Sequence, residues 1–231
     1  MSDSDWDMSS YSTFNHAKFK IGDIEIQMEH ISELCPIDAV ALVDGDDSTG
    51  LKIWEGASAL CEYLLTNKQQ FIGKSILELG SGVGLVGIFT ALLLPNQKIV
   101  LTDANSDALT VLSRNLSNNV PASSPQPDVI KLDWEEDKSN FIAQYPDLFD
   151  YIIGSDIIYS KESVIPLLST IQSLLKPNGK AIIMYISRGK RVDEHFMASS
   201  KEFNFNIIRT DFKEESQNQD QVYLCQLSKI K

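Results

Sequence analysis

One segment constrains the fold of this chain more than any other, because an apolar run leads directly into a glycine turn and then into a helix. Residues 76–85 read ILELGSGVGL. Glycines at such a turn let the backbone approach a ligand closely, and they aim the N–H groups of the helix N-terminus at it. The segment therefore predicts a strand, a ligand-binding turn and a helix of an open α/β sheet.

The rest of the chain continues this rhythm, because short apolar runs alternate with longer stretches of helical periodicity. The predicted strands are 75–79, 98–102, 129–132, 151–155 and 180–186, and the predicted helices are 54–65, 85–94, 107–116 and 165–175. Strands joined by crossover helices form a mostly parallel sheet. The turn sequence Pro177-Asn178-Gly179 is expected to stop the last of these helices.

The rhythm changes after residue 186. A helix at 192–201 precedes two predicted strands, 203–212 and 222–227, joined by the polar loop 213–221. This loop is too short for a crossover helix, so these two strands must pair antiparallel. The expected fold class is α/β, a Rossmann-like doubly wound seven-stranded sheet, mostly parallel with an antiparallel last strand.

The N-terminal region differs from the rest in composition. Residues 1–18 carry Ser and Asp with few aliphatic side chains, so we expect a mobile tail, and residues 19–49 form an extension with strands around Ile21, Ile24 and Ile26. Residues 50–231 form the main domain. A chain of 231 residues with 43% hydrophobic residues buries roughly 70% of its unfolded surface, so it needs neither disulfides nor metal for stability.

Charge and cysteine content exclude several classes of function. The chain has 20 Lys and Arg against 32 Asp and Glu, a net charge of −12, which opposes binding to nucleic-acid phosphates. No secretory signal and no long apolar run occur, so we expect no membrane contact. The expected location is the cytoplasm, with the nucleus as a second compartment. The odd number of cysteines indicates reduced thiols; they are Cys35, Cys61 and Cys225. None of the histidines has the spacing of a metal ligand; they are His16, His30 and His195.

The glycine turn has competing interpretations. Gly82, Gly84 and Gly87 satisfy the spacing G-x-G-x-x-G, which is also found in nicotinamide-dinucleotide sites. Asp103 ends the next predicted strand. A carboxylate there can accept hydrogen bonds from two ribose hydroxyls, whether the ribose belongs to a dinucleotide or to another nucleoside-containing cofactor. Alternatively, Asp103 caps the helix that begins near Asn105.

Two further motifs weaken the dinucleotide interpretation, because they place polar and aromatic groups at the carboxyl ends of the third and fourth strands. The motifs ELGSGVGLVGI, LTDAN, LDW and SDIIY, in this order, resemble the seven-β-strand S-adenosylmethionine-dependent methyltransferases of the protein-lysine branch, called family sixteen. The resemblance covers roughly residues 50–227. It implies S-adenosylmethionine as cofactor and S-adenosylhomocysteine as product.

The resemblance also implies which residues bind the cofactor. Gly80, Ser81 and Gly82 line its methionine part, Asp103 holds the ribose, Trp134 packs on the adenine, Ser155 contacts it through the backbone, and Trp54 closes the pocket. Adenine favours a flat apolar surface, and a sulfonium cation is favoured near aromatic faces. The simpler interpretation of both tryptophans is core packing. Glu78 either reaches the cofactor's amino group through water or favours the helix dipole, and the sequence leaves both open.

The substrate side of the resemblance rests on Asp-x-x-Tyr after the fourth strand, matched by Asp156 and Tyr159. Asp156 is expected to orient the incoming ε-amine of a lysine, and Tyr159 to form a wall of the lysine channel. The alternative makes Asp156 a cap of the following helix and Tyr159 a packing residue. Upstream, residues 50–55 resemble the family's segment around Trp54, although the family has Asp or Pro where this chain has Glu55.

The implied substrate is a protein with an exposed lysine, and the enzyme is expected to be a monomer. The branch modifies translation factors, chaperones, an AAA ATPase and calmodulin; residues 101–105 and 187–191 resemble the calmodulin enzyme, but a net charge of −12 would repel calmodulin. A lysine-rich target such as a translation elongation factor suits the charge better.

The alternatives are a nicotinamide-type small-molecule N-methyltransferase and a non-catalytic cofactor-binding scaffold. No Asn-Pro-Pro-Tyr or Asp-Pro-Pro-Tyr follows the fourth strand, which argues against nucleobase substrates.

Overall fold

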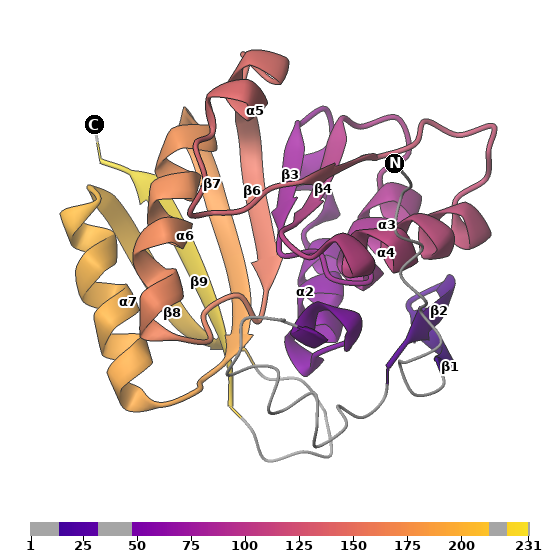
Figure 1. Ribbon diagram of the computed structural model, residues 1–231, viewed down its shortest axis with the longest axis horizontal. Coiled ribbons are helices and arrows are strands. Elements are labelled where there is room, and N and C mark those ends of the chain that lie inside the picture. The colour runs from indigo at the N-terminus through magenta and orange to yellow at the C-terminus, as the bar shows by residue number, and fades with distance from the viewer. Residues whose placement is uncertain (1–13, 32–47, 213–220, 231) are drawn as a thin grey trace, which may run out of the picture.

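The computed structural model describes residues 14–31, 48–212 and 221–230, and its centre is a seven-stranded sheet with helices on both faces (Figure 1). The strand order is β5-β4-β3-β6-β7-β9-β8. The strands are β3 (Ile76–Leu79), β4 (Ile99–Asp103), β5 (Asp128–Lys131), β6 (Phe149–Ser155), β7 (Leu175–Ile186), β8 (Phe205–Phe212) and β9 (Val222–Lys229).

The direction of the strands confirms the expected fold class. The pairs from β5 to β7 are parallel, whereas β9 is antiparallel to both of its neighbours, β7 and β8. The last strand of the chain therefore lies between two strands that precede it in the sequence.

Helices divide between the two faces of the sheet. One face carries α2 (Glu55–Thr66), α3 (Leu85–Leu93) and α4 (Ser106–Asn119), and the other carries α5 (Ser139–Gln144), α6 (Lys161–Leu174) and α7 (Lys190–Glu202). Two short 3-10 helices, η2 (Ser48–Leu51) and η3 (Lys68–Phe71), flank α2. Because successive strand side chains point to opposite faces, Ile76 joins the first apolar layer and Leu77 the second.

Most predicted elements are found within a few residues of their predicted bounds, and two details differ. Helix α5 was not predicted, since six residues are too few to show helical periodicity. The turn sequence at 177–179 does not stop a helix, because α6 ends earlier, at Leu174, and β7 already begins at Leu175.

A β-hairpin extends the layer formed by α2, α3 and α4. Its strands are β1 (Asn15–Ile21) and β2 (Ile24–His30), so the predicted tail was too long and residues 15–18 belong to a strand. Ile26 and Met28 are buried in the core. The backbone of β2 also bonds two side-chain amides of α4: Asn115 accepts from the N–H of Glu29, and Asn119 accepts from the N–H of Gln27, both at 2.8 Å.

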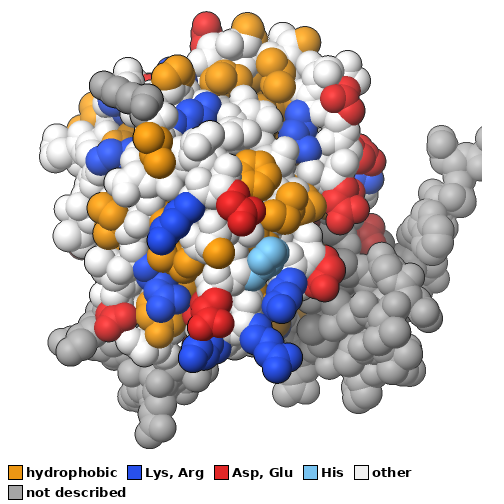
Figure 2. All heavy atoms as spheres, turned by 90° about the vertical axis from the view of Figure 1, so that its left-hand side faces the viewer, with side chains coloured by type: hydrophobic (Ala, Val, Ile, Leu, Met, Phe, Trp, Pro, Cys, Tyr) orange, Lys and Arg blue, Asp and Glu red, His pale blue; other side chains and the backbone are white. Residues whose placement is uncertain are grey.

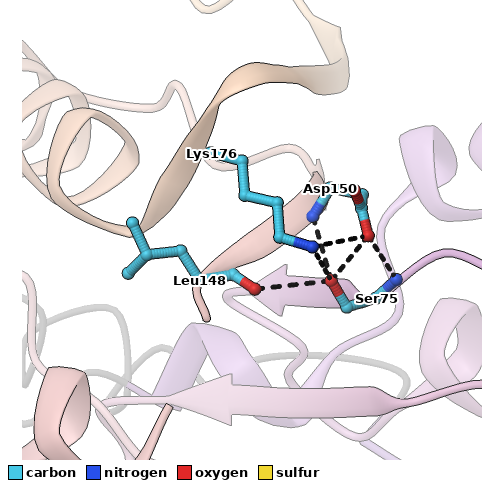
Figure 3. Close-up of polar contacts among 4 residues, drawn as sticks. All are labelled: Ser75, Leu148, Asp150 and Lys176. Atoms are coloured by element: carbon cyan, nitrogen blue, oxygen red, sulfur yellow. Dashed lines mark hydrogen bonds and ion pairs between the residues drawn. The ribbon is translucent and has the colours of Figure 1, made fainter. Parts of the chain in front are cut away.

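A polar cluster connects the amino ends of the two neighbouring central strands, β3 and β6 (Figure 3). The Asp150 carboxylate accepts from Lys176 Nζ at 2.9 Å and from the Ser75 N–H at 3.0 Å, while Ser75 Oγ accepts from the Asp150 N–H at 3.0 Å. Partial burial opposes ionisation, but the hydrogen bonds from Ser75 and Lys176 prevail and hold the pKa of Asp150 below its ordinary value. We call Ser75, Asp150 and Lys176 the amino-edge clamp.

The remaining expectations concern cysteines, metals and membranes. Cys61 and Cys225 are free and buried, and Cys35 lies outside the described residues. Within residues 14–31, 48–212 and 221–230, no three His, Cys, Asp or Glu side chains gather in a way that could hold a metal ion. No helix in this described part is both long and apolar enough to cross a membrane.

Candidate functional site

A cleft of about 560 Å³ opens at the carboxyl ends of β3, β4, β5 and β6. Ligands of open α/β sheets bind at this edge, and the volume is typical of a small-molecule site. The structure brings all the sequence-predicted site residues together in the lining of this cleft: Trp54, Gly80, Ser81, Gly82, Asp103, Trp134, Ser155, Asp156 and Tyr159. The strand order arranges them in a line, with Trp134 after β5 at one end and Asp156 after β6 at the other.

The glycine loop after β3 needs its glycines for two reasons. Gly80 and Gly82 have φ of +63° and +51°, a conformation that disfavours residues with a side chain. A Cβ on Gly82 would also lie 2.7 Å from the carbonyl oxygen of Gly50. Ser81 holds the loop to β4, because its N–H donates to the Thr102 carbonyl at 2.8 Å and its Oγ accepts from the Thr102 N–H at 3.1 Å.

Asp103 supports the same loop from the end of β4. Its carboxylate accepts from the N–H of Gly82 at 2.8 Å and from the N–H of Asn105 at 2.9 Å. The helix cap is Asn105, whose side chain accepts from the N–H groups of Asp107 and Ala108. The alternative that Asp103 itself caps α4 is therefore wrong. The Asp103 side chain also lines the cleft.

Glu78 is the residue whose role the sequence left open. It lies inside β3, is 1% exposed and lines the cleft, and its Oε2 has no hydrogen-bond partner among the described residues. Burial raises the pKa of Glu78 to about 8; a hydrogen bond from Ser81 opposes this, and the charge of Asp103 adds to it. A buried, unpartnered carboxylate oxygen in a cleft wall suits a cationic or hydrogen-bond-donating ligand.

Asp156 joins three segments that are distant in the sequence. Its Oδ2 accepts from the N–H of Gly56 at 2.7 Å, in the first turn of α2, and its Oδ1 accepts from the N–H of Ile186 at 3.0 Å, at the end of β7. The side chain is 2% exposed, and burial raises its pKa despite these bonds. Helix α6 is capped instead by Ser160, so the alternative of Asp156 as its cap is wrong.

The aromatic residues are wall residues rather than core. Trp54 and Trp134 are half-buried, and Tyr159 is 50% exposed. The Trp54 indole Nε1 donates to the Thr49 carbonyl at 3.1 Å. Trp134 also packs against the second apolar layer, so core packing accounts for part of its position.

Two cations beside Trp54 were not predicted as site residues. Lys52 Nζ lies 4.6 Å from the centroid of the Trp54 ring, and the guanidinium carbon of Arg188 lies 4.7 Å from it. Both distances are within cation–π range. Arg188 follows β7, far from Trp54 in the sequence, so no local pattern could have revealed this contact.

The sheet order and the position of the cleft define a class: the Rossmann-like fold of S-adenosylmethionine-dependent methyltransferases. Magnesium protoporphyrin IX methyltransferase from Synechocystis, solved with bound S-adenosylmethionine, has a TM-score of 0.59 at 15% identity over 81% of this chain and 84% of that chain. The glycopeptide N-methyltransferase MtfA with sinefungin also reaches 0.59, at 12% identity over 77% of this chain and 95% of that one.

Within this class the chain belongs to the lysine methyltransferase family, whose model matches residues 40–203. EEF1A lysine methyltransferase 3 of Xenopus tropicalis is 34% identical over 62% of this chain and 61% of its own length. METTL21A, a protein N-lysine methyltransferase of Danio rerio, is 32% identical over 74% of each chain, and calmodulin-lysine N-methyltransferase of Arabidopsis thaliana is 30% identical over 71% of this chain and 54% of its own length. The chain thus spans less than two thirds of some of the curated relatives it matches.

The residues of the cleft fit S-adenosylmethionine, the cofactor of this family. The unpartnered oxygen of Glu78 provides an acceptor for an amino group. Asp103, one strand further along the sheet, provides acceptors for hydroxyls, and Trp134, after the next strand, provides a flat apolar face. These three chemistries follow the order of amino acid, ribose and adenine in the cofactor.

Proposed function

We propose that this protein transfers methyl groups from S-adenosylmethionine to the ε-amine of a lysine in another protein. The observation that carries the proposal is the convergence of the four motifs of the lysine methyltransferase family on one cleft, with a cofactor-binding half and an open half. Bound S-adenosylmethionine supplies a methyl group on a sulfonium sulfur, which an amine nitrogen takes with its lone pair while the C–S bonding pair remains on sulfur.

The cofactor half consists of the ends of β3, β4 and β5. Gly80, Ser81 and Gly82 allow close approach of the methionine part, and Glu78 accepts its amino group. Asp103, already fixed by the N–H groups of Gly82 and Asn105, accepts the ribose hydroxyls. Trp134 covers the adenine and Ser155 contacts the cofactor through its backbone.

The substrate half consists of the ends of β6 and β7 and the start of α2. Asp156 is immobilised there by two N–H donors, so its free lone pairs point in fixed directions. In our proposal it orients the ε-amine and favours its cationic form on arrival, and the proton then leaves to solvent before transfer. Tyr159 and Trp54 form the walls of the channel.

The open end of the cleft favours a protein over a small amine. Tyr159 lines the cleft and remains half exposed. Apolar side chains at a rim suit contact with a second protein surface. The relatives named for EEF1A and calmodulin lysines favour a cytosolic target such as a translation elongation factor or a chaperone.

The test uses cell lysate depleted of the endogenous enzyme. Wild-type protein or Asp156→Ala is incubated in it with radiolabelled S-adenosylmethionine, and labelled proteins are resolved on a denaturing gel and the modified residue mapped by mass spectrometry. We expect a discrete band, labelled on lysine, that the variant does not produce. A panel of small amines, nicotinamide included, runs in parallel.

Other outcomes of this experiment would contradict the proposal. Label found only in a small amine would identify a small-molecule N-methyltransferase. Cofactor binding by calorimetry without transfer to any acceptor would identify a non-catalytic scaffold.

A further inference from the structure

Arg188 occupies a position on the substrate half that the proposed function leaves without a role. It is the second residue after β7, and its side chain is 35% exposed. Its Nη2 lies 4.0 Å from Asp156 Oδ1, and its guanidinium lies over the Trp54 ring. It therefore stands beside Asp156, which we propose orients the lysine, and beside Trp54, one of the two proposed walls of the channel.

The Arg188 guanidinium is held in one orientation, but its N–H donors are not all used in hydrogen bonds. The 4.0 Å separation from Asp156 permits Coulomb attraction but is too long for a hydrogen bond. Among the residues that the structure describes, no oxygen accepts a hydrogen bond from the Arg188 guanidinium. Its planar set of five N–H donors, stacked on an indole, matches the geometry of a carboxylate.

The backbone that carries Arg188 is anchored on both sides. The N–H of Ile186 donates to Asp156 at 3.0 Å, and Ser187 Oγ donates to Asp193 Oδ2 at 2.9 Å. Asp193 is itself buried and paired with Arg209 at 3.2 Å. These contacts fix the segment before Gly189, so the guanidinium is presented from a rigid base and little entropy is lost when a partner binds.

We infer that Arg188 is a specificity-determining residue, which binds an Asp or Glu side chain of the substrate protein next to the target lysine. The inference rests on the proposed function and names its substrate class: a lysine with a neighbouring carboxylate. The lysine enters between Trp54 and Tyr159, while its acidic neighbour pairs with the guanidinium at the rim. Lys52, on the same indole, adds positive charge to this side of the mouth.

The neighbouring face, formed by α7 and β8, carries both signs of charge, because blue and red side chains are interspersed on it (Figure 2). Binding of nucleic-acid phosphates needs several cations in a row. The planar guanidinium of Arg188, with Lys52 as the second cation on the Trp54 ring, instead suits one acidic side chain.

The test compares four variants with wild type on the lysate protein that wild type labels on lysine, produced recombinantly. Arg188→Glu reverses the charge, Arg188→Gln removes it without placing a carboxylate against Asp156, and Arg188→Lys keeps the charge without the planar fork. Lys190→Glu is the matched control, since Lys190 is the first residue of α7, two positions after Arg188, and its exposed side chain pairs only with Glu194 among the described residues. Cofactor affinity and melting temperature verify that each variant is folded.

We expect Arg188→Glu to reduce kcat/KM by at least about tenfold, mostly through KM, Arg188→Gln to reduce it less, Arg188→Lys least, and Lys190→Glu to leave it unchanged. Each substrate carboxylate beside the target lysine is then changed to Lys. One of these substrate variants is expected to restore the activity of Arg188→Glu and to impair wild type, as a double-mutant cycle requires.

Two results would overturn the inference while leaving the proposed function intact. One is wild-type activity of Arg188→Glu on this substrate. The other is a loss of activity that no reversal of a neighbouring carboxylate restores. If wild type labels no lysine in any protein, the proposed function itself fails.

Discussion

The two halves of the cleft are built in opposite ways. The cofactor half comes from consecutive strand ends, and its key bonds join neighbouring strand ends, such as Gly82 after β3 to Asp103 at the end of β4. The substrate half is assembled from three distant segments around one carboxylate, since Asp156 bonds Gly56 on one side and Ile186 on the other. The cofactor half depends on the conformation of the glycine loop, whereas the substrate half depends on the Asp156 carboxylate alone. A substitution of Asp156 should therefore reduce stability and activity more than a substitution in the cofactor half.

The largest effect is therefore expected for Asp156→Ala. It removes the acceptor for two partly buried N–H groups, each of which costs about 1–3 kcal/mol when left unpaired, so the free energy of unfolding should fall by about 2–6 kcal/mol. Methyl transfer should be abolished, whereas cofactor affinity should stay within a few fold. Urea unfolding and calorimetry measure these quantities. Asp211→Ala, an exposed aspartate on β8, serves as control; wild-type turnover in Asp156→Ala would remove Asp156 from the mechanism.

The next effect is expected on the cofactor half. Asp103→Ala removes both the proposed ribose acceptor and the support of the Gly82 N–H. Cofactor affinity should weaken by about 1.5–3 kcal/mol, or about 10- to 150-fold, as for charged hydrogen bonds to a ligand. Calorimetry with S-adenosylhomocysteine measures it. Unchanged affinity would show that the ribose lies elsewhere.

A third prediction concerns pH. The raised pKa of Glu78, about 8 in the folded protein, means that the cofactor-free protein binds more protons folded than unfolded between about pH 4.5 and 8. Its free energy of unfolding should therefore fall as pH rises through this window. Denaturant unfolding at several pH values should show the slope in wild type and a smaller one in Glu78→Gln. An equal slope in both proteins would contradict the assignment.

The raised pKa of Glu78 also predicts how the affinity for the cofactor depends on pH. A bound amino group stabilises the ionised form of Glu78, so the affinity of wild type should increase with pH up to about 8. Glu78→Gln should bind more weakly and lack this dependence. Calorimetric titrations at pH 6 and 8 distinguish the two proteins.

The smallest effect is expected far from the cleft, at the amino-edge clamp (Figure 3). Lys176→Ala removes one partner of a partly exposed ion pair, which lowers the free energy of unfolding by about 0.5–1 kcal/mol at neutral pH. The difference from wild type should be fully present above about pH 4 and be lost as pH falls further, through the lowered pKa of Asp150, because protonated Asp150 no longer attracts the lysine. Activity should not change; a large loss of activity would mean that this edge communicates with the cleft.

The same contrast explains how much the sequence alone could predict. Strand ends, the glycine loop and the fold class follow from local patterns. Asp103 was a candidate because it ends a strand, whereas Trp134 and Gly82 were assigned to the cofactor through the family resemblance. The bonds of Asp156 to Gly56 and Ile186 are long-range, and no periodicity records them. Arg188 escaped for the same reason, and the hairpin was underestimated because polar residues dominate its exposed face.

The position of β9 has a consequence for the order in which the molecule can assemble. Because β9 (Val222–Lys229) separates β7 from β8, strand β8 has no partner in the sheet until residues 222–229 have been synthesised. The nascent chain must therefore keep the edge of β7 and the whole of β8 without their native partner until residues 222–229 have emerged. A premature stop between residues 212 and 222 would leave two open strand edges, which are templates for aggregation.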